Sequence, residues 1–169
     1  MGKLKFSMAA AGLLMATQVW AAEPDAAHIK AAHDLLVSMQ AEKMLRMTAG
    51  TSHYANPAQR AEVMDKVIKI QPEYVYSHLA LPVARLISTE TATEMTRYYA
   101  SSYGQRVLHH TYNSGPSLYD TDPEPTAKEK VELNKPAFQK ANAEFKKAEG
   151  AIHHEAFLLV AEINRKPAQ

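Results

Sequence analysis

The 169-residue chain contains no cysteine. Disulfides, cysteine-ligated zinc or iron–sulfur centres, thiol nucleophiles and lipid anchors attached to cysteine are therefore excluded. The chain also lacks an excess of charge of one sign, because 19 basic residues stand against 18 acidic ones. This balance argues against a nucleic-acid-binding protein, whose surface usually carries a basic excess. The remaining composition, with 46% hydrophobic and 22% charged residues, is typical of a globular protein.

The only long apolar run stands at the start of the chain. Two lysines precede an apolar stretch at 6–19, and small residues follow it. This pattern predicts a signal peptide over residues 1–21, with cleavage after Ala21, or after Ala22 as the second choice. A transmembrane anchor is disfavoured because the stretch is shorter than the roughly 20 residues that a membrane-spanning helix needs. Loss of the two lysines leaves 17 basic residues against 18 acidic ones, so the net charge changes from +1 to −1. We therefore expect a soluble exported protein, with the bacterial periplasm as the first choice of location and the medium as the second.

Glycine is scarce in the rest of the chain, where only four occur. Strict alternation of apolar and polar residues is also rare, so strands and hairpins have little support. Apolar residues instead recur at a spacing of three or four from end to end. This spacing predicts an all-α fold.

Several residues mark where helices should begin and end. Asp25 is expected to cap the first helix, and residues 41–49 should form a second one that ends at Gly50. Glycine suits the left-handed position after a helix. Asn56 followed by Pro57 predicts another helix start, because proline fits the first helical position.

The middle of the chain contains one helix breaker and one further cap. Pro82 lies inside a helical pattern and removes a backbone donor, so we expect a kink or a break near Leu81. Ser88 is expected to cap the helix that follows. Residues 113–125 are rich in proline and predict an internal linker.

The C-terminal part gives the strongest periodic signal. Thr126 with Glu129 predicts a capping box, and Pro136 predicts a second start soon after it. Apolar residues then keep the helical spacing from 138 to 163, across Gly150. The sequence therefore predicts one helical domain over 22–169, an irregular bundle of about five to seven helices with a long C-terminal helix.

One segment resembles a known family. Residues 94–108 read EMTRYYASSYGQRVL and are similar to the F-Y-x-S-P-x-G-Q-[KR] signature of a bacterial exported family, the domain of unknown function number twenty fifty-nine. Tyr98 and Ser102 depart from the family's phenylalanine and proline. The resemblance covers about residues 27–112, including an N-terminal helix pair, and implies an all-helical exported protein with no established activity. It transfers no catalytic residue.

The same segment supplies the candidate site. In one interpretation it is structural: Ser101 or Ser102 caps a new helix, Gly104 admits a close neighbour, and Arg106 holds a carboxylate or a carbonyl. In the other it is a small aromatic pocket that meets a ligand or a partner. The candidate ligand- or partner-binding residues are Tyr98, Tyr99, Tyr103, Gln105, Arg106 and His109. We favour the structural interpretation, because aromatic residues at helical spacing usually pack.

Histidine is abundant, with eight residues. The doublets at 109–110 and 153–154 cannot chelate as pairs, because adjacent residues point about 100° apart on a helix. A metal site would need ligands from separate helices. No metal ligand set, cofactor motif or catalytic set is predicted, since the hydrolase, phosphate-loop and dinucleotide patterns are absent.

Three functional hypotheses follow from these patterns. The first is a non-enzymatic periplasmic protein that binds another component of the cell envelope, such as a protein. The second is a protein that binds a metal or a small ligand through histidine. The third is an enzyme of unfamiliar type, which would require Tyr98, Arg106, His109 and an acidic residue to meet in one cleft. The oligomeric state is not indicated.

Overall fold

The computed structural model describes residues 23–113 and 122–165. These residues form only helices, which confirms the all-α prediction. The structure describes eight helices, one more than the upper end of the predicted range of about five to seven. The helices are α1 (Ala26–Ser38), α2 (Ala41–Thr51), α3 (Pro57–Lys69), α4 (Pro72–Ala84), α5 (Thr89–Ala100), α6 (Ser102–Asn113), α7 (Ala127–Leu133) and α8 (Pro136–Arg165).

The predicted caps are confirmed. The side chains of Asp25, Asn56 and Ser88 each accept a hydrogen bond from the backbone N–H three residues later. Thr126 and Glu129 form both halves of a capping box at the start of α7. These side chains satisfy backbone donors that the first turn of a helix leaves without partners.

One local prediction is wrong, and of the kink or break predicted in α4 the break is absent. Gly50 does not end α2 in a left-handed conformation, because the helix continues to Thr51. The left-handed residue is instead Gln40, with φ 56°, in the tight turn between α1 and α2. Helix α4 shows no break near Leu81, since it runs through Pro82 and ends at Ala84. Pro82 lies two residues before the last residue of α4, so its missing N–H removes one backbone hydrogen bond in the final turn and leaves the rest of the helix intact.

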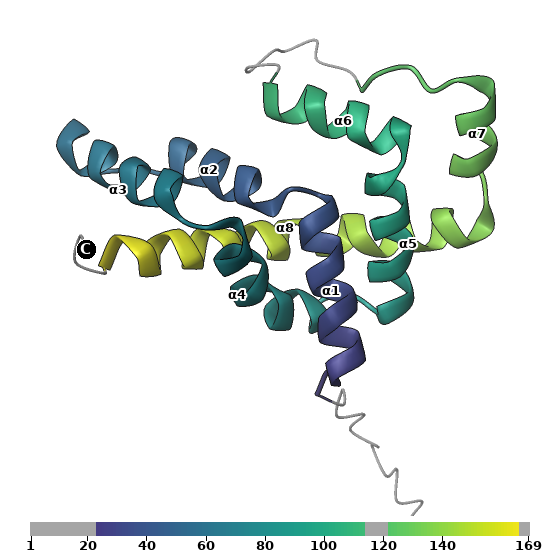
Figure 1. The fold of residues 1–169 in the computed structure, drawn as a ribbon, viewed down its shortest axis with the longest axis horizontal. Coiled ribbons are helices and arrows are strands. Elements are labelled where there is room, and N and C mark those ends of the chain that lie inside the picture. The colour runs from purple at the N-terminus through teal and green to yellow at the C-terminus, as the bar shows by residue number, and fades with distance from the viewer. Residues whose placement is uncertain (1–22, 114–121, 166–169) are drawn as a thin grey trace, which may run out of the picture.

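The long helix α8 organises the bundle. It crosses the whole molecule and contacts α2, α3, α4, α5 and α7, while α1 packs against α4 and α5 (Figure 1). The buried face of α8 runs from Phe138 to Ile163 and includes Ala148, one turn before Ile152. The prediction of one long C-terminal helix that continues across Gly150 is confirmed.

A carboxylate on α8 fastens this helix to the start of α5. Glu144 accepts hydrogen bonds from the Ser88 backbone N–H at 2.6 Å and from the Ser88 hydroxyl at 3.0 Å. It also accepts one from the hydroxyl of Thr91, a residue that is only 2% exposed, at 2.7 Å. These bonds lower the pKa of Glu144 although partial burial opposes that shift. The tertiary contact therefore works as a second cap on α5.

Some predictions concern residues outside the described ranges. The signal peptide at 1–21 and its cleavage site lie outside them, as does most of the linker at 113–125. Of that linker, Asn113 is the last residue of α6, and residues 122–125 are not helical. Within 23–113 and 122–165, none of the helices combines the length and the apolar character that crossing a bilayer requires.

Candidate functional site

The corner between α5 and α6 is built around Ser101 and Gly104. The Ser101 hydroxyl donates to the Tyr98 carbonyl at 2.6 Å and accepts from the Gly104 N–H at 3.0 Å. A Cβ placed on Gly104 would lie 2.1 Å from that Tyr98 carbonyl oxygen and 2.8 Å from the Tyr99 Cα. Only glycine fits here, because the atoms it faces belong to a backbone that cannot swing away. The structural interpretation of this segment is thus confirmed for the cap and for the close approach.

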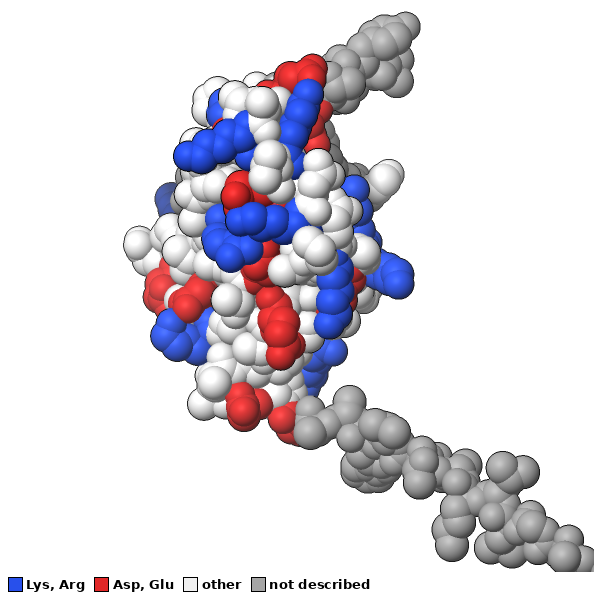
Figure 2. Space-filling view, turned by 90° about the vertical axis from the view of Figure 1, so that its right-hand side faces the viewer, with Lys and Arg blue, Asp and Glu red and all other residues white. Residues whose placement is uncertain are grey.

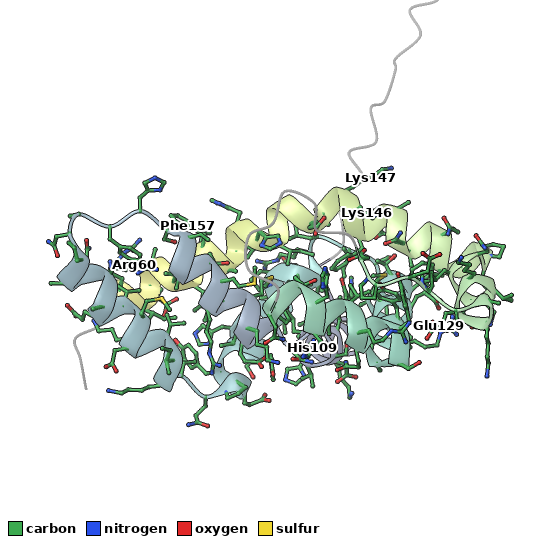
Figure 3. The ribbon with its side chains drawn as sticks, turned by 90° about the horizontal axis from the view of Figure 1, so that it is seen from above. Arg60, His109, Glu129, Lys146, Lys147 and Phe157 are labelled. Carbon is green, nitrogen blue, oxygen red and sulfur yellow. The ribbon has the colours of Figure 1, made fainter. Side chains whose placement is uncertain are left out.

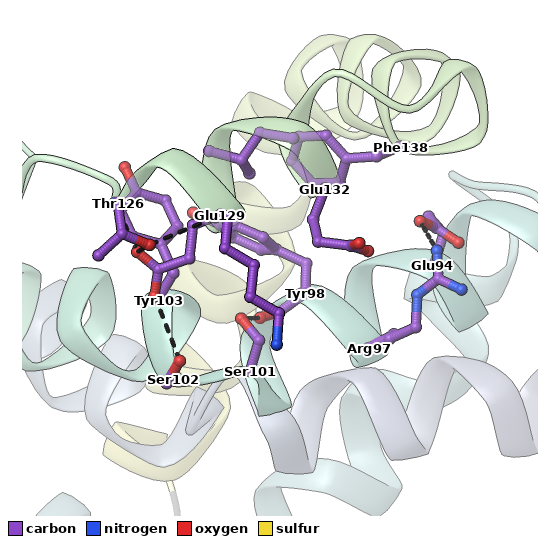
Figure 4. Close-up of a pocket in the computed structure, with 12 residues that line it drawn as sticks. Glu94, Arg97, Tyr98, Ser101, Ser102, Tyr103, Thr126, Glu129, Glu132 and Phe138 are labelled. Atoms are coloured by element: carbon purple, nitrogen blue, oxygen red, sulfur yellow. Dashed lines mark hydrogen bonds and ion pairs between the residues drawn. The ribbon is translucent and has the colours of Figure 1, made fainter.

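The corner also forms one wall of a pocket of about 280 Å³, which we call the α5–α7 pocket (Figure 4). Helix α7 and the first turn of α8 form its other walls. Its apolar floor consists of Tyr98, Tyr103, Leu133 and Phe138. The Tyr98 ring lies 5.1 Å from the Phe138 ring and 6.1 Å from the Tyr103 ring, centroid to centroid. The polar rim consists of Glu94, Arg97, Ser101, Ser102, Thr126, Lys128, Glu129 and Glu132.

Each carboxylate on this rim already has a cationic partner. Arg97 pairs with Glu94, and Lys135 pairs with Glu132 at 2.5 Å. Glu129 accepts two hydrogen bonds from the Arg106 guanidinium, at 3.0 and 2.9 Å. This geometry is bidentate and favours the charged forms.

Of these carboxylates, Glu129 accepts the most hydrogen bonds within the described residues. Besides Arg106, the Thr126 backbone N–H donates to it at 2.8 Å and the Ser102 hydroxyl at 3.3 Å. The Arg106 hydrogen bonds, followed by the Thr126 N–H, lower the pKa of Glu129 to about 2. The hydrogen bonds to Glu129 in turn raise the pKa of Arg106. Glu129 is therefore ionised and fully engaged, so it offers no proton for acid–base chemistry.

Lys128 is the exception on the rim. It is exposed and makes no ion pair or hydrogen bond within the described part of the chain. Its neighbour Lys130, also exposed, pairs with Glu124 at 3.0 Å instead. The molecular surface at this end interleaves acidic and basic side chains rather than separating them by sign (Figure 2). The pocket thus combines an apolar floor with one lysine that has no ion pair among the described residues, although its charge, after the Lys135 hydrogen bond, helps to lower the pKa of Glu132.

The six predicted site residues do not form one site. Tyr98 and Tyr103 line the α5–α7 pocket. Arg106 stands behind it, with its guanidinium 5.3 Å from the centre of the Tyr103 ring, and acts through Glu129.

The other three are structural or lie elsewhere. Gln105 donates to the Tyr99 carbonyl at 2.6 Å and accepts from Gln40 at 3.1 Å, so it closes the end of α5. His109 is exposed, lines neither this pocket nor the larger cleft described below, and lies across the molecule from Lys146 (Figure 3). Tyr99 faces that larger cleft. The arrangement required for an enzyme, with Tyr98, Arg106 and His109 in one cavity, is therefore not formed.

Sequence reasoning missed most of the rim. Nothing in the sequence distinguishes three of the rim residues from ordinary solvent-facing ones: Arg97, Lys128 and Glu132. Phe138 is expected only as the first apolar residue of a long helix. The sequence singled out four rim residues, but only as parts of helix caps: Ser101, Ser102, Thr126 and Glu129. No sequence signal places α7 against α5 and α6, because the linker that precedes it has no helical pattern.

The described residues hold no cluster of three or more His, Asp or Glu side chains that could bind a metal ion. Two of the histidines on α1 instead contact α4 and the segment that connects it to α5. His28 shares a hydrogen bond with the Ile87 carbonyl at 2.8 Å, and His33 with Glu73 at 2.9 Å. The hypothesis of a histidine metal site therefore finds no ligand set in residues 23–113 and 122–165.

Comparisons of the chain with family models, with curated proteins and with solved structures found no match. The resemblance to the exported family of unknown function stays a prediction from residues 94–108 and the N-terminal helix pair.

Proposed function

We propose that this protein is an exported, periplasmic binding protein without enzymatic activity, and that the α5–α7 pocket holds part of another envelope protein. The occupant is an apolar side chain that stands beside a carboxylate. The floor of Tyr98, Tyr103, Leu133 and Phe138 supplies the apolar contact. Lys128 supplies the charge.

The observation that carries this proposal is the state of the rim charges. Glu94, Glu129 and Glu132 are each paired with a cation of the same chain, whereas Lys128 is not. Because the rim carboxylates are held in ion pairs, Lys128 is the rim charge without an ion pair among the described residues, and a carboxylate on a ligand complements it. Export is supported by the pattern of residues 1–21, and absence of catalysis by the full engagement of Glu129 and by the separation of Arg106 from His109.

The test is affinity capture from an envelope extract, with light scattering to establish the oligomeric state of the bait. Three baits are compared: the unchanged protein, Lys128→Glu and the matched control Lys130→Glu, which makes the same charge change two residues along the same helix. We expect a specific partner on the unchanged bait and on the control, and about tenfold less on Lys128→Glu. An excess of 4-phenylbutyrate, an apolar body with a carboxylate, should release the partner.

Capture that is equal on all three folded baits would refute the assigned pocket. Capture of no specific partner by any of them would refute the binding function itself.

A further inference from the structure

A second and larger cavity lies on the other side of α5 and α6, where α2 and α8 approach them. It measures about 370 Å³, within the range of about 300–1,000 Å³ that is common for small-molecule sites. We call it the thioether cleft, because Met39, Met44, Met47 and Met95 all line it. They are four of the five methionines that follow the signal peptide. Methionine side chains adapt to irregular apolar shapes, so they suit a ligand-binding wall.

Aromatic rings complete the apolar wall. Tyr99 packs edge-to-face on Tyr98 at 4.9 Å and on Phe145 at 6.1 Å, centroid to centroid. Tyr112 lines the same cleft and is held in place by a 2.8 Å hydrogen bond from its hydroxyl to the Met39 carbonyl. The Tyr99 hydroxyl has no hydrogen-bond partner within the described residues, so its oxygen is open to a ligand's donor.

Two carboxylates stand at the mouth of the cleft. Asp122 and Glu149 both line it, are exposed, and make no ion pair within the parts of the chain that the structure describes. Both face Tyr99: burial raises the pKa of its hydroxyl, and the two negative charges raise it further. Lys146 is the one lysine on the lining and His153 its one histidine, so with histidine counted as neutral the lining carries a net charge of −1.

We infer that the thioether cleft binds a small hydrophobic amine. The aromatic and thioether wall takes the apolar body of the ligand. The ammonium group lies at the mouth between Asp122 and Glu149, where the Tyr99 oxygen can accept one of its hydrogens. This site differs from the proposed partner pocket in both position and charge preference. Tyr98 alone lines both cavities.

The test uses three ligands with the same apolar body and different heads: 4-phenylbutylamine, 4-phenylbutanol and 4-phenylbutyrate. Each is titrated into purified protein carrying ¹³C-methyl methionine. We expect the amine to bind about tenfold more tightly than the alcohol, and the acid to bind most weakly at this site. The amine should shift the methyl signals of the four cleft methionines and leave that of Met64 on α3 in place.

Variants at exposed positions separate binding from folding. The double change Asp122→Asn with Glu149→Gln should lower amine affinity about tenfold and leave alcohol affinity unchanged. Met47→Lys, at a side chain that is 46% exposed, should abolish amine binding because it places a cation in the cleft. Ile68→Lys, at a 57% exposed position on α3, is the control and should have no effect.

Equal affinity for the amine and the acid would overturn the proposed charge preference. Absence of amine binding, or signal changes that include Met64 equally, would overturn the site. Neither result bears on envelope-protein capture through Lys128.

Discussion

The two cavities of this molecule share Tyr98 but differ in the charges that they leave unpaired. In the α5–α7 pocket every rim carboxylate is tied to a cation of the same chain, and Lys128 remains. In the thioether cleft Asp122 and Glu149 remain, with Lys146 beside them. Charge counting alone would describe both as mixed. The ion pairs inside the protein decide which charge each cavity offers to a ligand.

The largest effect is expected from a substitution at Gly104, in the α5–α6 corner that separates the two cavities. Gly104→Ala puts a methyl group 2.1 Å from the Tyr98 carbonyl oxygen, so α5 and α6 must move apart. We expect a loss of about 3 kcal/mol in the free energy of unfolding, measured by urea denaturation. The control is Gly150→Ala on α8, where the added carbon meets nothing within 4 Å.

That control should stabilise the protein by about 0.5–1 kcal/mol, because alanine loses less entropy than glycine in a helix interior. Equal effects of the two substitutions would contradict the claim that the α5–α6 corner requires glycine.

A smaller effect is expected from weakening the contact between α8, which lines both cavities, and the start of α5. Glu144→Gln replaces a carboxylate that accepts from three donors of Ser88 and Thr91 with a group that has only one acceptor oxygen. We expect a loss of about 2 kcal/mol in the free energy of unfolding. Glu155→Gln on the same helix makes the same chemical change at a residue with no such bonds, and should be nearly neutral. A thermal melt of both variants decides whether the contact stabilises the fold.

The smallest effect is expected from a substitution that removes one charge from the rim of the α5–α7 pocket. The pKa of Glu129 falls from 4.5 to about 2 on folding, so its stabilising contribution is full above pH 4.5. That contribution is lost as the pH falls from about 4.5 to about 2. The melting temperatures of the unchanged protein and Glu129→Gln should therefore differ at pH 6 and converge toward pH 2.

Glu124→Gln, which breaks the exposed pair with Lys130, should give little difference at any of these pH values. A difference for Glu129→Gln that stays constant with pH would show that the Arg106 pair is not what lowers the pKa of that carboxyl.

The caps and the long helix could be predicted because their causes are local. Thr126 and Glu129 are three residues apart, and the apolar spacing of α8 lies within one segment. The close approach at Gly104 was also predicted, since a glycine in a first turn has few other reasons to be there. The prediction at Gly50 was wrong because glycine occurs inside helices as well as after them. Nothing in the local sequence distinguishes a glycine inside a helix from one that ends it.

The site could not be predicted because it depends on distant pairings. Arg106 and Glu129 are 23 residues apart across a linker, and Ser88 and Glu144 are 56 apart. No local pattern shows that Lys128 is the cation left without a partner, because this follows only when every other pair is known. The gathering of four methionines on one cleft likewise arises from the packing of α2 and α5 beside α6 and α8.

The most direct test of the opposite charge preferences is one methyl NMR titration. Protein labelled at leucine and methionine methyl groups reports on both cavities, since Leu133 lines only the α5–α7 pocket and Met39, Met44, Met47 and Met95 line only the thioether cleft. We predict that 4-phenylbutyrate shifts Leu133 and leaves the methionines in place, and that 4-phenylbutylamine does the reverse. Both ligands shifting the same set of signals would contradict the account.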